Sequence, residues 1–253
     1  MRVTFLGTGT SQGVPVINCQ CKVCSSLDYR DKRLRSSVHI EVDDKSFIID
    51  SGPDFRQQVL SNQITKLDAL IFTHQHKDHI AGMDDVRGFN FTQQKDMPVY
   101  ASSQVIRQLK QEFAYVFVND KYPGVPRVVV NEIQNQPFIA EGVTFTPIEV
   151  LHYKLPVFGY RIGNFTYITD AKTIAEEEKE KLFGTEVLVL NALQHKQHIS
   201  HFTLEESLAL IEEINPRRAF LTHISHNLGM HQEVSRMLPL GVQLAYDSLS
   251  IEI

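Results

Sequence analysis

Six consecutive residues, from His74 to His79, constrain this chain more than any other part of its sequence. They read His-Gln-His-Lys-Asp-His and directly follow an apolar, strand-like run. Imidazole and carboxylate groups suit zinc, manganese and iron, and such ligands often lie where a strand ends and a loop begins. His74 and His76 are two residues apart and can hold one metal. Asp78 and His79 can hold a second metal beside it, so the run predicts half of a two-metal hydrolytic site.

The alternative interpretation is that these histidines only fill space. A single histidine is usually a packed or surface residue, and the chain has 11 of them. Packing does not explain four metal-type side chains within six residues, placed directly after a strand. Matching side chains also follow later in the chain, at the ends of strand-like runs: His152, Asp170 and His223.

The pattern HxHxDH, followed in order by a distant His, an Asp at a strand end and a last His, resembles the metallo-β-lactamase superfamily along essentially the whole chain. The resemblance implies an α/β fold, the αββα sandwich, in which two mixed β-sheets are flanked by helices. It also implies two divalent catalytic metals, for which zinc, manganese and iron all fit. Seven ligands are implied: His74, His76 and His152 for one metal, Asp78, His79 and His223 for the other, and Asp170 as the bridge.

Alternating strand-like and helix-like segments are consistent with this architecture. The expected strands are residues 2–6, 37–42, 46–50, 69–73, 99–101, 143–150, 158–162, 165–169, 187–190, 219–222 and 242–244. The expected helices are residues 53–60, 80–87, 103–113, 171–182, 203–213 and 231–237, and the fifth opens with a capping-box pattern, Thr203 to Glu206. The stretch from Thr92 to Pro137 is the least patterned. No linker or repeat divides the chain, so we predict one domain over residues 1–253.

Composition limits the partners. The chain has 253 residues, 42% of them hydrophobic, and a formal net charge of −5, which disfavours broad nucleic-acid binding. No apolar run approaches the ~20 residues that span a bilayer, and the N-terminal sequence lacks the features of a signal peptide. We therefore expect a cytoplasmic protein with a small-molecule substrate and no membrane partner. A homodimer is left open.

Cys19, Cys21 and Cys24 form a CxCxxC cluster, which is compact enough to hold zinc but leaves a tetrahedral site one ligand short. His226 is the best candidate for the fourth ligand. The branch of the superfamily that the chain most resembles pairs such a triplet with that histidine; it includes the phosphoribosyl 1,2-cyclic phosphate phosphodiesterases of carbon–phosphorus lyase pathways and the pyrroloquinoline-quinone biosynthesis protein B. A closed Cys3His shell implies a structural zinc. The alternative is three free thiols.

Two further features refine the expected site. The glycines of Gly7 to Pro15 resemble the opening of the cyclic phosphodiesterase branch and of tRNA 3′-processing endonucleases, and we interpret them as a tight turn that lets the backbone approach the metals. Asp50 ends a strand, and in the family an acidic residue there lies near the ligands. We expect Asp50 to orient a metal-bound histidine, whereas the alternative is a turn or cap former.

The chemistry requires a proton donor as well, because an alkoxide leaves poorly unless it is protonated. His201 matches the histidine that precedes a helix in the phosphodiesterase and tRNA-processing branches, where it faces the scissile phosphate. We therefore expect His201 to be the general acid, with His198 as a second candidate for that role and Lys196 as a candidate for phosphate contact. The alternative for His198 and Lys196, which we favour, is a surface role. Asp78 is expected to orient the attacking hydroxide in addition to binding metal.

The leading interpretation is a metal-dependent phosphodiesterase for small substrates, including cyclic ribose phosphates, with a hydroxide shared by two metals as nucleophile. One rival is a tRNA 3′-processing endonuclease, but residues 92–137 lack the expected Gly-rich, basic arm. Another is a thioester or lactone hydrolase, since fold does not determine function. The third is a non-catalytic cofactor-biosynthesis protein, against which the complete ligand set argues.

Overall fold

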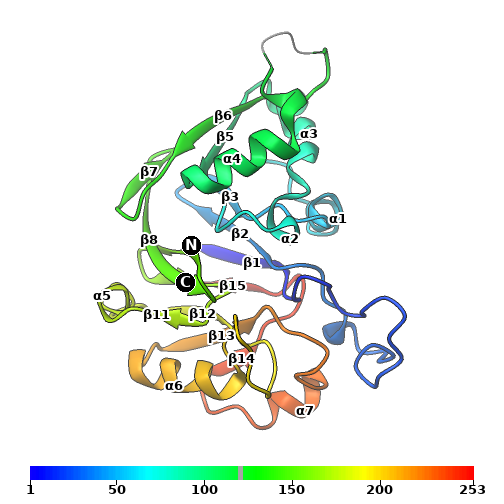
Figure 1. The fold of residues 1–253 in the computed structure, drawn as a ribbon, viewed down its shortest axis with the longest axis vertical. Helices are drawn as coiled ribbons and strands as arrows, with labels where there is room; N and C mark the ends of the chain where they lie inside the picture. Colours follow the sequence, from blue (N-terminus) through cyan, green and yellow to red (C-terminus); the bar gives the residue numbers. More distant parts are fainter. Residues whose placement is uncertain (119–121) are drawn as a thin grey trace.

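The computed structural model describes residues 1–118 and 122–253. Residues 119–121, inside the poorly patterned stretch from Thr92 to Pro137, lie outside the described residues. Two β-sheets pack face to face, with one group of helices above and another below (Figure 1). This is the expected αββα sandwich of two mixed sheets.

The first sheet changes from antiparallel to parallel pairing along its width. Its order is β15 (Ser250–Glu252), β1 (Arg2–Gly7), β2 (Ser37–Val42), β3 (Lys45–Ile49), β4 (Ala69–Ile71), β5 (Met97–Ala101) and β6 (Val128–Glu132). From β3 to β6 all neighbours run parallel. The carboxyl ends of four strands therefore lie along one edge, which is where ligands bind in parallel sheets.

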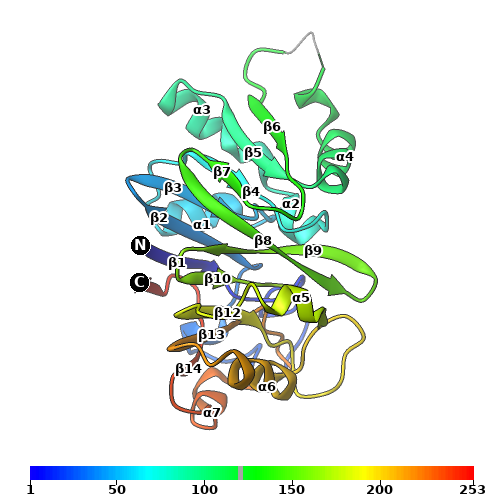
Figure 2. The same ribbon diagram turned by 90° about the vertical axis from the view of Figure 1, so that its left-hand side faces the viewer.

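The second sheet supplies the remaining strands. Its order is β11 (Thr173–Ile174), β8 (Val143–His152), β9 (Leu155–Ile162), β10 (Phe165–Tyr167), β12 (Val187–Asn191), β13 (Arg218–Thr222) and β14 (Val242–Leu244), while β7 (Phe138–Ala140) pairs with β8. The long β8–β9 hairpin crosses the molecule between the two halves (Figure 2). Its turn brings His152 to the edge where the parallel strands of the first sheet end.

Alternation along the strands explains the layers. In β3, Phe47 and Ile49 face the core between the sheets, whereas Ile48 faces the helices above. In β12, Val189 faces the same central core, whereas Leu190 faces the helices below. Successive strand residues point to opposite faces, so a sheet buried on both sides needs apolar residues at every position.

The helices cover the outer faces. Above the first sheet lie α1 (Phe55–Ser61), α2 (Lys77–Ile80), α3 (Arg87–Gln93) and α4 (Ser103–Glu112); on the second sheet's side lie α5 (Glu176–Lys179), α6 (Leu204–Ile214) and α7 (His231–Ser235). Short 3-10 turns occur at Tyr29–Asp31, Met83–Val86 and Ala114–Val116. The capping box expected at Thr203 and Glu206 is present, with both reciprocal bonds formed. None of the helices in the described ranges is long and apolar enough to cross a membrane.

Two predicted helices are wrong in extent. Residues 171–182 contain only the four-residue α5, because Thr173 and Ile174 pair with β8 as the edge strand β11. Residues 80–87 do not form one helix, because Gly82 packs against the backbone of Gly52 and donates its N–H to Ser51. Strands β6, β7 and β15 were not predicted. The partners of β6 and β15 lie far away in the chain, whereas β7 forms a hairpin with β8, which follows it after two residues.

Candidate metal centres

The seven predicted ligands come from the ends of strands in both sheets. His74 and its neighbours follow β4, His152 ends β8, Asp170 follows β10 and His223 follows β13. The structure brings them all to one edge of the sandwich. His74, His79, Asp170 and His223 are buried, so their polar atoms need partners within the site.

The first predicted metal group is partly assembled. Nε2 of His74 lies 3.0 Å from Nδ1 of His76. The ring of His152 lies 5.2 Å from that of His76 and 5.9 Å from that of His74, measured between centroids. Two nitrogens that bind one metal at about 2.0–2.1 Å are separated by roughly 3.0–3.4 Å, so the separation of His74 and His76 fits a common ion.

The second group gathers around Asp170. Its Oδ2 lies 3.1 Å from Nε2 of His79 and 3.2 Å from Nδ1 of His223. Oδ2 of Asp78 lies 3.2 Å from the same His79 nitrogen. The rings of His74 and His79, one from each predicted group, are 4.2 Å apart. Asp170 therefore lies where a carboxylate could reach two neighbouring cations.

A bound metal would give a partner to two buried nitrogen atoms that have no hydrogen bond in the described part of the chain. Nε2 of His79 and Nε2 of His223 are both buried and have no hydrogen-bond partner among the described residues. The His79 nitrogen nevertheless lies close to two carboxylates, without the geometry of a hydrogen bond to either. Buried polar atoms of this kind call for an unseen partner, and nitrogen and carboxylate donors fit zinc, manganese or iron.

Three histidines are oriented by bonds from their other ring nitrogen. Oδ2 of Asp50, which is fully buried, lies 2.7 Å from Nδ1 of His79, so Asp50 lies where the sequence predicts an orienting carboxylate. The Thr73 hydroxyl donates to Asp50 and can therefore accept from Nδ1 of His74, 3.0 Å away. The carbonyl of Ser200 accepts from Nδ1 of His152 at 2.9 Å. In each ring, Nε2 is left for a metal.

Charge in the site follows from these contacts. Burial opposes a charge on His79, but Asp170, Asp78 and Asp50 outweigh it and raise its pKa well above the usual value. Burial also opposes ionisation of Asp170, yet the nearby His223 and His79 hold its pKa well below the usual value. Burial lowers the pKa of His223 to about 3. The centre thus keeps ionised carboxylates beside neutral His223, both ready to bind a cation, whereas His79 must give up its proton when a cation binds.

Close backbone packing positions the loop that carries the His74–His79 run. A Cβ atom on Gly52 would lie 2.0 Å from the carbonyl oxygen of Asp78, and one on Gly82 would lie 2.1 Å from that of Gly52. The N–H of Ser51 also donates to the carbonyl of His79. Only glycine, which has no Cβ atom, allows the backbone to come this close at the two positions. Both glycines are therefore needed to place the loop that carries the predicted ligands.

His201 lies beside the predicted bridge. Its Nε2 is 2.9 Å from Oδ1 of Asp170, and its ring is 4.5 Å from that of His152. Its Nδ1 lies 3.1 Å from the Ser200 hydroxyl and 3.2 Å from Nδ1 of His198. His152, Asp170 and His201 are also close enough to share a metal. The geometry therefore allows His201 to act either as a proton donor or as a ligand.

Some partners in the site were not found from the sequence. They are all small hydroxyl residues: Ser36, whose hydroxyl lies 3.2 Å from Nδ1 of His223; Thr169, whose hydroxyl lies 3.4 Å from the same atom; and Thr73. Thr73 and Thr169 are next to predicted ligands in the chain, which was an available signal. Ser36 gave no signal, because it meets His223 only through the fold.

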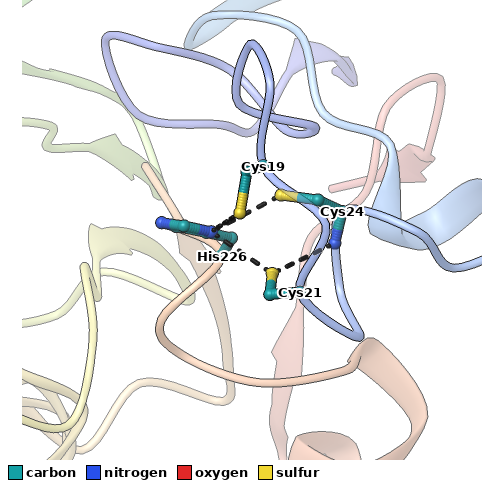
Figure 3. A group of neighbouring side chains, drawn as sticks. All are labelled: Cys19, Cys21, Cys24 and His226. Carbon is teal, nitrogen blue, oxygen red and sulfur yellow. Dashed lines mark hydrogen bonds between the residues drawn. The ribbon is translucent and has the colours of Figure 1, made fainter.

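The cysteine cluster forms a second compact group. The sulfurs of Cys19, Cys21 and Cys24 each lie 3.4 Å from Nδ1 of His226, and the four side chains point toward a common centre (Figure 3). Zinc bonds of about 2.3 Å to sulfur and 2.0–2.1 Å to nitrogen, at tetrahedral angles, give separations of roughly 3.5 Å. A bond from the Cys24 N–H is the largest influence that lowers the pKa of Cys21 to about 6, which favours the metal-binding thiolate.

This cluster is joined to the first centre through the backbone. Ile224 donates its N–H to the carbonyl of Thr8, and Gly9 forms bridges with both Ile224 and Arg35. His223 and His226 flank Ile224, so the N-terminal loop holds the segment that carries one predicted ligand of each centre. A Cβ atom on Gly9 would lie 2.9 Å from the Arg33 carbonyl, which agrees with the interpretation of the glycines as a close-approach turn.

Comparisons with known proteins agree with the fold. Residues 45–224 match a family model described as a β-lactamase superfamily domain. A crystal structure described as a new diphosphatase from the PhnP family is 41% identical, with a TM-score of 0.93, and the alignment covers 100% of this chain and 97% of that one. The structure of Zn2+-bound PqqB from Methylobacterium extorquens has a TM-score of 0.81 at 19% identity, with full coverage of both chains; this likeness shows the fold alone.

The curated relatives are longer proteins. An octanoyltransferase of Porphyromonas gingivalis is 40% identical over 252 residues, which are 98% of this chain and 51% of that protein. A coenzyme PQQ synthesis protein B of Rhodopseudomonas palustris is 27% identical over 169 residues, covering 62% of this chain and 53% of that protein. The chain thus spans about half the length of these relatives, and their names describe more than the part that is shared.

Proposed function

Because the chain belongs to the metallo-β-lactamase superfamily, we propose that it is a metal-dependent hydrolase, and specifically a phosphodiesterase for small substrates such as cyclic ribose phosphates. The observation that carries the proposal is the Asp170 cluster, in which one carboxylate lies within 3.2 Å of nitrogens from His79, His201 and His223. The similar diphosphatase also supports hydrolysis at phosphorus.

We assign the predicted ligand roles to the residues that the fold gathers. Seven residues would hold two divalent ions, zinc, manganese or iron: His74, His76, Asp78, His79, His152, Asp170 and His223. Such a pair of ions, when bound, lowers the pKa of water and neutralises charge on a phosphodiester. Cys19, Cys21, Cys24 and His226 would hold a structural zinc, because four protein ligands leave no open position.

The side chains around the ions supply orientation and a proton. Asp170 is ionised, so the 2.9 Å contact requires His201 to hold a proton on Nε2 and to donate it to Oδ1 of Asp170. When the ring also carries a proton on Nδ1, a leaving oxygen that reaches Nε2 would receive the Nε2 proton and leave a neutral imidazole, which is the general-acid role. The second oxygen of Asp78 is available to orient an attacking water, because Asp78 is only partly buried.

The remaining expectations on organisation are kept as proposals. A single domain over residues 1–253 is supported by one central core to which both sheets contribute. A small phosphodiester substrate and the absence of a membrane partner are carried forward from the sequence, and the net charge of −5 disfavours nucleic acid as a partner. A cytoplasmic location is carried forward from the sequence as a prediction, and a homodimer stays open.

A thioester hydrolase is the second candidate. It is favoured by the 40% identity to a protein named an octanoyltransferase, although this chain covers only 51% of that protein. The two candidates differ at His201, because a thiolate leaves without the proton that an alkoxide requires. Hydrolysis of an octanoyl thioester, without hydrolysis of any phosphodiester, would replace the leading proposal.

The direct test is hydrolysis of bis(p-nitrophenyl) phosphate by metal-replete protein. We expect metal-dependent activity that falls at least about a hundredfold in His76→Ala, because one ion loses a ligand. The matched control is His195→Ala, an exposed histidine outside the Asp170 cluster, which should keep wild-type activity. Absence of activity in protein shown to hold both metals would reject the phosphodiesterase.

A further inference from the structure

Asn191, the last residue of β12, is a fully buried amide that has no role in the predicted site. Its side-chain oxygen accepts a hydrogen bond from the N–H of Ala171 at 2.8 Å, and its side-chain nitrogen donates to the carbonyl of Ala171 at 3.0 Å. Two bonds in opposite directions require a side chain that both donates and accepts, as an amide does. Asn191 therefore holds both backbone groups of the residue that directly follows Asp170.

These two bonds hold the chain where it leaves the sheet. β10 runs parallel to β12, and just beyond β10 the N–H of Ile168 still donates to the carbonyl of Val189 at 2.9 Å. Asp170 then has a left-handed backbone conformation, with φ of 56°, which cannot continue a strand. Such a conformation persists only where the surrounding contacts determine it, and the bonds between Asn191 and Ala171 are contacts of this kind.

Ala171 also connects to the segment that carries His201. The carbonyl of Ala171 accepts a second hydrogen bond, from the N–H of Phe202 at 2.8 Å. Phe202 directly follows His201, so the two segments that meet at Ala171 carry the two side chains of the 2.9 Å contact between His201 and Asp170. Because Asn191 fixes Ala171, it fixes the backbone on both sides of this contact.

Asn191 is also paired with the segment that carries His223. In the parallel ladder its partner is Thr222 of β13, the residue directly before His223. The carbonyl of Thr222 accepts a hydrogen bond from the N–H of Ala192 at 2.9 Å. Asn191 thus lies between the segments of Asp170 and His223, and Oδ2 of Asp170 is 3.2 Å from Nδ1 of His223.

Helix α6 holds Asn191 in place. This helix packs against β12 (Figure 2). The hydroxyl of Ser207 on α6, which is fully buried, lies 2.6 Å from the carbonyl of Asn191 and donates to it. An apolar side chain at position 191 would leave the buried N–H of Ala171 without this acceptor, which is costly. The amide is therefore specified by its bonds and not by packing alone.

We propose that Asn191 is the residue that positions Asp170 and His201 relative to each other. It acts on both through the backbone of Ala171, so it is a positioning residue and neither a ligand nor a proton donor. The proposal rests on the proposed function only in the roles given to Asp170 and His201. Groups that orient metal ligands change metal affinity or activity by about ten- to a hundredfold when they are removed.

The first test measures metal binding and requires no turnover. Asn191→Asp keeps the shape of the side chain but replaces its donor by an oxygen, which repels the carbonyl of Ala171. The probe is Mn2+, measured by competition with a chelator, because thiolates such as those of the cysteine cluster prefer zinc. We expect the affinity for Mn2+ to fall about tenfold or more, since Asp170 loses the support of its backbone.

The matched control is Asn90→Asp. Asn90 is a buried residue of α3 whose amide also binds backbone groups: it donates to the carbonyls of Lys95 and Arg127 and accepts from the N–H of Arg127. Neither partner is next to a predicted ligand in the chain, so this variant should keep the wild-type affinity for Mn2+. Thermal unfolding shows that each variant is folded at the temperature used. Where Asn191→Asp is not, Asn191→Ala, which removes the bonds without adding a charge, takes its place.

The second test addresses His201. In metal-saturated Asn191→Asp, kcat should fall more for an alkyl phosphodiester than for a nitrophenyl one, because a displaced proton donor mainly affects a basic leaving group. Equal slowing of both esters would overturn the positioning of His201.

An affinity for Mn2+ in Asn191→Asp that equals the wild-type value, or that falls no more than in Asn90→Asp, would overturn the positioning of Asp170. A wild-type protein that binds Mn2+ but hydrolyses no phosphodiester would reject the proposed function alone. The comparison of Mn2+ affinities would still decide the role of Asn191, so the two failures are distinguishable.

Discussion

His201 and Asp170 define the chemistry at the scale of single residues. Their 2.9 Å contact places a protonated nitrogen beside the predicted bridge between two ions. The same histidine lies close enough to His152 and Asp170 to act as a ligand. Replacing His201 therefore has different effects under the two roles. Loss of a proton donor slows only substrates with a basic leaving group, whereas loss of a ligand also lowers the metal content.

We predict that His201→Ala keeps both catalytic metals, slows hydrolysis of an alkyl phosphodiester about a hundredfold or more, and slows nitrophenyl esters less than about tenfold. Nitrophenolate leaves with little need of a proton. The measurement is steady-state kcat/KM for the two esters, together with metal content by elemental analysis. Equal slowing of both esters would reject the general-acid role, and loss of a metal would make His201 a ligand.

The residues of the site that could be predicted from the sequence are those that belong to the motif and its later partners. All seven predicted ligands and Asp50 come together at one edge of the sandwich, where the sequence interpretation put them. Ser36 could not be predicted, because it meets His223 only after segments far apart in the chain have packed together. A single sequence contains no signal for such contacts.

At the scale of elements, the sequence predicted those helices and strands whose bounds depend on neighbouring residues in the chain. The helix after Thr203 begins at its capping box, and β2 and β14 have the predicted bounds. The prediction of a helix from Ala171 to Leu182 was wrong, because Thr173 and Ile174 pair with β8 at the sheet edge in spite of the helical charge pattern. Strand β6 was missed although its three consecutive valines are a local strand signal, and its pairing with β5, about thirty residues away, is not visible in the sequence.

Strand β2 contains a buried histidine that should couple stability to pH. Burial lowers the pKa of His39 to about 4, whereas an unfolded histidine titrates near 6.5. Between these values the unfolded chain binds more protons. The stabilising contribution is therefore complete above about pH 6.5 and declines as the pH falls toward 4, by at most about 1.4 kcal/mol per pH unit.

We predict that His39→Gln loses less stability than wild type when the pH is lowered from about 7 to about 5. Glutamine does not titrate, and its amide can still donate to the Ser46 hydroxyl, which itself donates to the Lys66 carbonyl. Urea unfolding at both pH values measures the difference. Parallel losses in the two proteins would show that His39 does not carry the pH dependence.

At the scale of the whole molecule, the cysteine cluster joins the first thirty residues to the last thirty. Its four side chains come from Cys19 to Cys24 and from His226, and Gly9 and Ile224 extend the join toward His223. The architecture of two sheets and the family were predictable from one motif and its later partners. The contact between the N-terminal and C-terminal segments was predictable only in part, because only His226 was predicted as the fourth ligand of the cysteine cluster.

We predict that Cys21→Ala loses one zinc per chain and lowers the melting temperature by about 5 °C or more, since metal binding contributes to folding stability. Zinc content and thermal unfolding are measured together. Ser25→Ala, an exposed position in the same loop, is the matched control and should change neither. Zinc content that stays at the wild-type value would reject the structural site.

Three residues at the metal edge, Asp50, Asp170 and His223, have left-handed backbone conformations, with φ of 66°, 56° and 54°. For residues other than glycine this conformation costs about 1 kcal/mol or more. Unfavourable backbone conformations are therefore concentrated at the predicted metal site. A directed search for heat-resistant variants, made without selection for activity, is expected to collect glycine or asparagine at these positions, and the variants that survive heating best would be the least able to work.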